Sequence, residues 1–445
     1  MVNVPELDSA RPGQWLSAAT DWQDLGTNLG GIAGQVDSGV TGVISRGEWT
    51  GAAATAAHAR MQAAVNALEA AHGEVNAVAD VLEGLGQAMA VCQRALDEAK
   101  QMASQYGLTI RADGTVSPFS GNAFERAVEE SVQWIEGGSN SAQVAQVQEL
   151  VTGALRRATQ ADQEAAGELR RIASHADLTD PAATYGDNMH PNADGLTASR
   201  LELQMIYQSI PSGPPALVSK WWSGLSSAEK NTLMLAAPGT IGTLAGIPAI
   251  VQARLRGTTG INRVALVNYA LNNTLNNAGD VPGEDNCTNF ASDALLAAGL
   301  HEEGNLVGDK ILHTDSSTDD NWYKQSPIWP LGAGSTRSHS WGGAQDLHEF
   351  LTHNGSQEVP YSDALPGDVA FFKDNKGIYH TAVITAKVNG QVFYSQHTPG
   401  EQNADWASRQ TMPDITNPHN PSSVIIVRPG QDHAPVPTPQ PNQAP

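Results

Sequence analysis

The first hundred residues carry two apolar stripes at helical spacing. One runs from Trp15 to Val43 and the other from Met61 to Ala99, with apolar positions three or four residues apart. This spacing places the apolar side chains on one narrow face of each helix. Two such helices bury their stripes against each other. We therefore expect residues 1–106 to form an antiparallel helical hairpin that buries stripe residues such as Trp22, with Trp49-Thr50-Gly51 at its tip.

Less regular elements follow the predicted hairpin. Asp113-Gly114 is typical of a β-turn, so residues 107–116 predict a small hairpin of two strands. Residues 124–136 and the stripe from Val144 to Ile172 predict a second helical pair, which completes a region of residues 107–195. Residues 196–256 form a helical connector in which Trp221-Trp222 pack against a neighbouring element. The Pro- and Gln-rich tail, residues 431–445, is expected to be disordered.

Residues 257–430 change to a mixed pattern. An apolar face built from Phe290, Ala294 and Leu295 predicts a helix that begins at Cys287. Short apolar runs at 369–372, 381–385 and 392–395 predict strands. The chain is therefore expected to be multidomain, with all-α hairpins first and an α+β domain last.

Charge and composition exclude several classes of protein. The formal net charge is −22 and the isoelectric point is about 4.8, so we expect no nucleic-acid partner. The longest apolar stretch, residues 233–251, contains Pro238, Gly242 and Pro248, so we expect no membrane span. No charged segment followed by an apolar one stands at the start of the sequence, so we expect no ordinary secretory signal. The chain is then cytoplasmic unless another route exports it.

Cys287 is the strongest candidate for chemistry. A helix N-terminus carries partial positive charge, which favours the thiolate form of a cysteine placed there. His380 and His397 follow on consecutive predicted strands. His380 can take the thiol proton as general base, and His397 can hold His380 in the required tautomer. Cys92, in contrast, lies on an apolar helical stripe and is expected to be a small core residue.

Some assignments remain open from the residues alone. Gln396 or Asn289 could replace His397 as the orienting residue, and the second oxyanion donor besides the Cys287 N–H is not assigned. His348 and His353 are five residues apart, about 140° around a helix, which is too far for one metal ion. We expect no metal and no cofactor. Trp322, Tyr323, Trp329 and Trp341 fit either a substrate groove or the core.

The N-terminal pattern resembles the WXG100 family of small helical-hairpin proteins. Trp49-Thr50-Gly51 matches the family's Trp-x-Gly turn, and the flanking helices have the right length. The resemblance covers about the first 105 residues. It implies export as a folded hairpin by a type VII secretion system, with that machinery or another WXG protein as a partner.

The C-terminal region resembles the amidase-6 domain family, which is similar to papain-fold NlpC/P60 hydrolases. The resemblance rests on Asn262-Arg263, Tyr269-Ala270, Cys287-Thr288-Asn289-Phe290, Leu365-Pro366-Gly367-Asp368, His380 and Gln396-His397-Thr398. It implies a papain-like fold and a Cys/His hydrolase of amide bonds, with Cys287 as nucleophile, His380 as base and His397 as the orienting residue. The family usually has Asp immediately before the cysteine, whereas this chain has Asn286.

Two functions fit these observations. The first is a cysteine amidase that acts on peptidoglycan or a related peptide as an exported effector. The second is a non-enzymatic WXG-type scaffold that carries a degenerate papain fold. The set Cys287, His380 and His397 favours the first.

Overall fold

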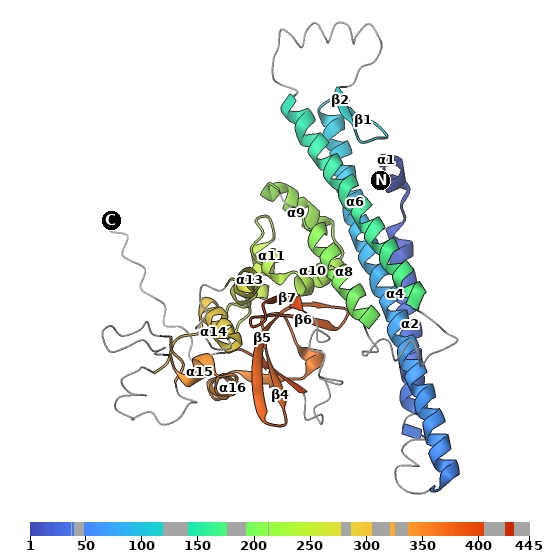
Figure 1. The fold of residues 1–445 in the computed structure, drawn as a ribbon. Coiled ribbons are helices and arrows are strands. Elements are labelled where there is room, and N and C mark those ends of the chain that lie inside the picture. The colour runs from blue at the N-terminus through green and yellow to red at the C-terminus, as the bar shows by residue number, and fades with distance from the viewer. Residues whose placement is uncertain are drawn as a thin grey trace, which may run out of the picture. The chain divides into compact units, whose positions relative to one another are not determined.

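The computed structural model divides the chain into two compact units, Met1–Pro211 and Ser212–Pro445 (Figure 1). The boundary falls inside residues 196–256, which the sequence pattern groups as one connector, because helix α8 (Ala193–Ser209) packs against helices of the first unit. The predicted helix over residues 124–136 and the tail 431–445 lie outside the described residues. The structure describes residues 1–36, 38–39, 49–118, 141–175, 193–211, 213–276, 286–304, 321–324, 337–404 and 423–430.

The first unit is helical and is organised around one long helix, α4 (Ala52–Gln105). Helix α2 (Pro12–Val36), α6 (Ser141–His175) and α8 all pack against α4. The short helix α1 (Val4–Ser9) begins at a capping box formed by Asn3 and Glu6. Strands β1 (Leu108–Ile110) and β2 (Val116–Pro118) pair across the predicted Asp113-Gly114 turn. None of the helices in the described part of the chain is long and apolar enough to cross a membrane.

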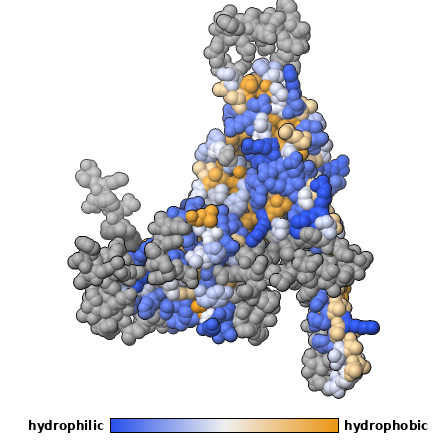
Figure 2. All heavy atoms as spheres, viewed as in Figure 1, coloured by the Kyte–Doolittle hydropathy of each residue, from blue (hydrophilic) through white to orange (hydrophobic). Residues whose placement is uncertain are grey.

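Helix α2 runs antiparallel to α4, but it does not bury the predicted stripe. Its buried residues are Ala19, Gly26 and Ala33, spaced seven apart, whereas Trp22 and Leu25 are 37% and 44% exposed. The helices approach closely along the small residues: a Cβ added to Gly26 would lie 2.2 Å from Asn76 Oδ1. The expected burial of Trp22 was therefore wrong, because close contact through small side chains turns the larger ones outward. Figure 2 shows apolar residues beside polar ones on the surface at the lower end of the first unit in that view.

The stripe on α6 is buried as predicted. Val147, Val151, Leu155 and Ala158 lie in one core with the C-terminal half of α4. Cys92 is 1% exposed in that core, which confirms its prediction as a core residue. Side chains stacked at i, i+4 and i+7 on both helices explain how such long helices bury a continuous seam.

The second unit combines short helices with one antiparallel sheet. The strand order is β3-β8-β4-β5-β6-β7, and every neighbouring pair is antiparallel (Figure 1). The strands are β3 (Gln357–Val359), β4 (Val369–Asp374), β5 (Gly377–Val388), β6 (Gln391–Gln396), β7 (Glu401–Ala404) and β8 (Ser423–Arg428). The helices are α9 (Pro215–Gly224), α10 (Ser227–Ala236), α11 (Pro238–Ile241), α12 (Ala249–Arg256), α13 (Arg263–Asn273), α14 (Cys287–Ala297), α15 (His339–Gly342) and α16 (Ala344–His353), with a 3-10 turn at Tyr361–Asp363.

The sheet buries side chains on both faces. Val369, Phe371 and Val383 point into a core shared with residues of α13, α14 and α16. Phe372 and Ile384, one residue further along each strand, belong to a separate core on the opposite face. Successive strand residues point to opposite faces, so the two cores follow from the alternation. The chain is thus helical first and sheet-containing last, as predicted, with strands longer than the sequence indicated.

Candidate active site

Helix α14 begins at Cys287, where the sequence pattern predicted a helix start. The apolar face of this helix, including Phe290, Ala294 and Leu295, lies in the core beside the sheet. Cys287 is buried, with 4% exposed. The N-terminal end of α14 places partial positive charge at the thiol. Asn286 does not cap the helix with its side chain, because its Oδ1 accepts a hydrogen bond from Asn289 Nδ2 at 2.8 Å.

His380 lies on β5 and is hydrogen-bonded to Gln396 on β6. The distance from His380 Nε2 to Gln396 Oε1 is 2.7 Å, and both residues are buried. The His380 ring meets the ring of Phe372 edge to face, with centroids 5.5 Å apart. An amide oxygen can only accept, so this contact requires the proton on Nε2. Neutral His380 then carries an unprotonated Nδ1, the form that can accept a proton from a thiol.

His397 lies beside helix α14. Its ring centroid is 6.0 Å from that of Phe290, and its Nδ1 is 3.2 Å from Thr398 Oγ1. Phe290 also contacts Tyr269, whose pKa is raised to about 12 by burial and, less, by the charge of Asp293. The side chain that holds His380 Nε2 is therefore Gln396, the alternative left open by the sequence, and His397 is placed against helix α14.

Two direct contacts join the start of α14 to the histidine-bearing strands. Thr288 Oγ1 lies 3.4 Å from Thr381 Oγ1, and the Asn286 N–H donates to Thr398 Oγ1 at 3.1 Å. The residues on either side of Cys287 thus contact the residues that directly follow His380 and His397. This arrangement places His397 on the face of the sheet that α14 covers, together with Cys287, whose Sγ lies 3.7 Å from Thr288 Oγ1. His380 pairs with Phe372, so its side chain lies on the opposite face of the sheet.

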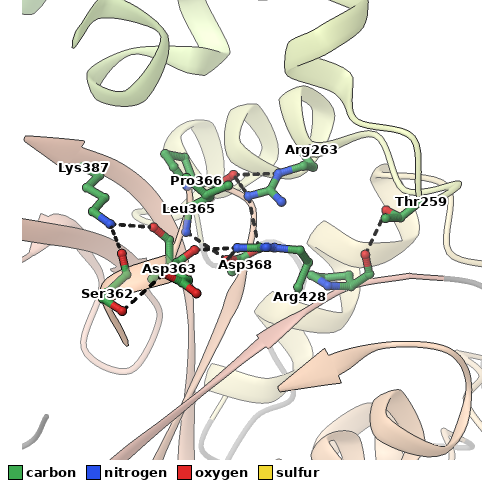
Figure 3. Close-up of polar contacts among 11 residues, drawn as sticks. Thr259, Arg263, Ser362, Asp363, Leu365, Pro366, Asp368, Lys387 and Arg428 are labelled. Atoms are coloured by element: carbon green, nitrogen blue, oxygen red, sulfur yellow. Dashed lines mark hydrogen bonds and ion pairs between the residues drawn. The ribbon is translucent and has the colours of Figure 1, made fainter. Parts of the chain in front are cut away.

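A buried charge cluster holds the loop that precedes β4 (Figure 3). Asp368 is fully buried and accepts from Arg263 at 3.1 Å, from Arg428 at 3.0 Å and from the Leu365 N–H at 2.9 Å. Burial lowers the pKa of Arg263, although the neighbouring Asp368 opposes the shift. Gly367 has φ +91°, and a Cβ there would lie 2.9 Å from Arg263 Cβ. The Arg263 and Leu365–Asp368 motifs therefore position the strand that pairs with β5.

Three of the aromatic residues that fitted either a groove or the core, Trp322, Tyr323 and Trp341, belong to the core. Trp322 and Trp341 are fully buried and stack with centroids 4.6 Å apart. Trp322 Nε1 donates to Ser292 Oγ at 3.1 Å, and Ser292 Oγ donates to the Trp341 carbonyl. Tyr323 is 1% exposed, while Trp329 lies outside the described residues. These contacts hold the middle of α14 at Ser292, whereas the start of the helix contacts β5 through Thr288.

The histidines of α16 have separate partners. His348 Nε2 lies 2.8 Å from Glu358 Oε1, and His353 Nδ1 lies 2.7 Å from the Glu349 carbonyl oxygen. Within the described ranges, no group of three or more His, Cys, Asp or Glu side chains is arranged to hold a metal ion.

The comparisons with known proteins bear on this unit. Residues 260–417 match the family model described as a putative amidase domain. No curated protein and no solved structure matches the chain. The matched range contains α13, α14 and strands β3 to β7, and so Cys287, His380, Gln396 and His397. The match supports a C-terminal amidase domain, and with it hydrolase activity in general.

Proposed function

We propose that this protein is a cysteine-dependent amide hydrolase with Cys287 as its nucleophile. The observation that carries the proposal is the pair of contacts at the start of α14, which set Cys287 between the residues that follow His380 and His397. A thiol at a helix N-terminus near an imidazole is the arrangement that activates cysteine for attack on a carbonyl.

The reaction follows from the roles of two side chains, Cys287 and His380. In the proposed reaction the His380 ring turns from the Phe372 face of the sheet toward α14. Its Nδ1 takes the thiol proton of Cys287, and the thiolate sulfur attacks the amide carbon. Helix N–H groups at the start of α14 stabilise the oxygen that becomes negative. The C–N bond breaks as His380 returns the proton to the leaving amine, which leaves a thioester on Cys287. Water then attacks the thioester, its proton passes through His380 to the sulfur, and the acid is released.

Gln396 and His397 divide the remaining tasks. Gln396 accepts from His380 Nε2 and so holds the ring with Nδ1 unprotonated. His397 lies against Phe290 and Thr398, close to the start of α14. We assign it to the substrate side of the thiol rather than to the back of the His380 ring.

We further propose that the substrate is a peptide amide of peptidoglycan and that the protein acts as an exported effector. The support for export is the helical first unit, in which Trp49-Thr50-Gly51 directly precedes α4. The alternative is a non-enzymatic scaffold. Its specific expectation is that Cys287 can be replaced without consequence.

Digestion of purified peptidoglycan separates these alternatives. The full-length protein should release fragments with new amino and carboxyl ends, which mass analysis identifies. Cys287→Ala should release none, whereas Cys92→Ala should match the wild type because Cys92 lies in the other unit. Equal turnover by Cys287→Ala and wild type of any substrate would sink the cysteine mechanism.

A further inference from the structure

We propose that Glu401 is a positioning residue that sets the tautomer of His380 through the side chain of Gln396. This inference rests on the proposed function, in which His380 must accept a proton at Nδ1. It adds a fifth side chain to the site, after those of Cys287, His380, Gln396 and His397, and one that lies outside the set predicted from the sequence.

Glu401 is held opposite Gln396 by strand pairing. The two residues are partners in the register of β6 and β7, and Gln396 Nε2 donates to Glu401 Oε2 at 2.8 Å. The rest of β7 is anchored independently. The Asn403 N–H donates to Ser395 Oγ at 3.1 Å, and Gln402 Nε2 donates to the Leu271 carbonyl at 2.9 Å. The Glu401 carboxylate therefore has a fixed place beside the buried amide.

The chemistry of the two side chains fixes the direction of both hydrogen bonds. An ionised carboxylate only accepts, so the NH₂ group of Gln396 must face Glu401. The amide oxygen then faces His380, and an oxygen requires a donor, so His380 carries its proton on Nε2. The carboxylate thus selects one of two amide orientations, and the amide orientation selects one of two imidazole tautomers.

A positive charge at position 401 should reverse the direction of both hydrogen bonds, the one to Gln396 and the one from Gln396 to His380. A lysine ammonium only donates, so Glu401→Lys favours the Gln396 oxygen facing residue 401 and its NH₂ group facing His380. His380 must then accept at Nε2 and carry its proton on Nδ1, where it can no longer take the proton of Cys287. Gln396→Glu combined with Glu401→Gln places a carboxylate directly on His380 Nε2 and should restore the original tautomer.

Nitrogen-15 NMR of the histidine-labelled full-length protein tests this directly, with His380→Gln to assign the signal. Wild type and the double variant should show the Nε2–H tautomer of His380, and Glu401→Lys should show Nδ1–H. Cys287 alkylation at pH 7 should also slow in Glu401→Lys, because His380 Nδ1 then carries a proton and cannot accept the one on the thiol. Gln402→Lys adds a positive charge on the same strand, beside the Leu271 carbonyl, and should leave both readouts unchanged.

The outcomes are separable from the proposed function. An Nε2–H tautomer that persists in Glu401→Lys overturns the role of Glu401, whether or not the protein hydrolyses amides. A switch of tautomer in a protein whose wild type cleaves no amide supports the role of Glu401 and rejects the hydrolase. If Glu401→Lys unfolds, the isosteric Glu401→Gln should give a mixture of the two tautomers, and a single Nε2–H form there also overturns the inference.

Discussion

The Arg263 guanidinium lies 3.1 Å from the fully buried carboxylate of Asp368. Removing the carboxylate leaves Arg263 and Arg428 partly buried without their shared acceptor. Asp368→Ala should therefore destabilise the second unit by about 3–5 kcal/mol. Hydrogen exchange of peptides from β4 and β8 in the full chain measures the loss. The control is Asp363→Ala, an exposed carboxylate in the same loop, and a similar change in both variants would contradict the prediction.

The two cysteines should differ in reactivity. Burial raises the pKa of the Cys92 thiol, partly offset by Arg157. Cys287 lies at the N-terminus of α14, where the proposed mechanism needs a reactive thiol. Iodoacetamide at pH 7 should label Cys287 in the folded protein and spare Cys92, while both react in urea. His380→Ala should slow the labelling of Cys287. Equal rates for the two thiols in the folded protein would show that Cys287 is not activated.

Substitutions of Gln396 and of His397 should affect different kinetic constants. Gln396→Ala removes the acceptor on His380 Nε2, so kcat should fall by roughly 10²- to 10⁴-fold, the usual effect of disabling a general base. His397→Ala should mainly raise KM, because its described contacts are with Phe290 and Thr398. The steady-state rate at which fragments are released from peptidoglycan, measured at several peptidoglycan concentrations, gives both kcat and KM. The reverse pattern would restore His397 as the orienting residue.

The packing of helix α8 against α4 should be more stable at low pH. Glu202 is fully buried, and its pKa is raised well above the ordinary 4.5, first by desolvation and then by Asp80 and Glu83. The facing Ser199 Oγ donates to Asp80 Oδ2 at 2.5 Å. Because the folded-state pKa is raised, the stability linked to Glu202 is fully present below pH 4.5. It is lost as the pH rises through the folded-state pKa.

Hydrogen exchange of α8, corrected for intrinsic rates, should accordingly be slower at pH 5 than at pH 8. Glu202→Gln should remove most of this difference and protect α8 at pH 8. Glu164→Gln, at the α6–α8 contact with Gln204, is the control and should retain the wild-type dependence. An identical pH profile in Glu202→Gln would assign the dependence to other groups.

The first unit should be needed for export. Deleting residues 1–106 should stop secretion in a host with a type VII system, because the helical hairpin with Trp49-Thr50-Gly51 would be lost. Trp49→Ala, at a residue 45% exposed, should reduce export while α4 stays folded. Cys287→Ala should be exported normally. Immunoblots of medium and cells give the ratio, and undiminished secretion of the deleted form would reject this role.

The sequence pattern predicted a feature correctly where that feature depends on a single helix or turn. The helix start at Cys287, the Asp113-Gly114 turn and the buried stripe of α6 each depend on residues close in sequence. The exposure of Trp22 does not, because it results from how closely Gly26 lets α2 approach α4. A periodic stripe shows that a face is apolar, but the partner helix decides which face is covered.

The third member of the site needed the strand register. Gln396 and His397 are adjacent, so they point to opposite sides of the strand. Gln396 meets His380 while His397 meets Phe290 of α14. Nothing in the local sequence chooses between them, because the β5–β6 register shift between Ile384 and Ala386 changes which residues face each other. Glu401 was missed for the same reason, since its role depends on its pairing with Gln396.

The strand order has a consequence for biosynthesis. Strand β8 is the last strand of the sheet to leave the ribosome, yet it lies between β3 and β4 and carries the Arg428 that binds Asp368. Until β8 inserts, β4 lacks a neighbour on one side and the charge of Asp368 is only partly balanced. A nascent chain that already carries Cys287, His380 and Gln396 therefore lacks the completed sheet that aligns them. The proposed hydrolase activity should therefore appear only after residue 428 has left the ribosome and β8 has inserted.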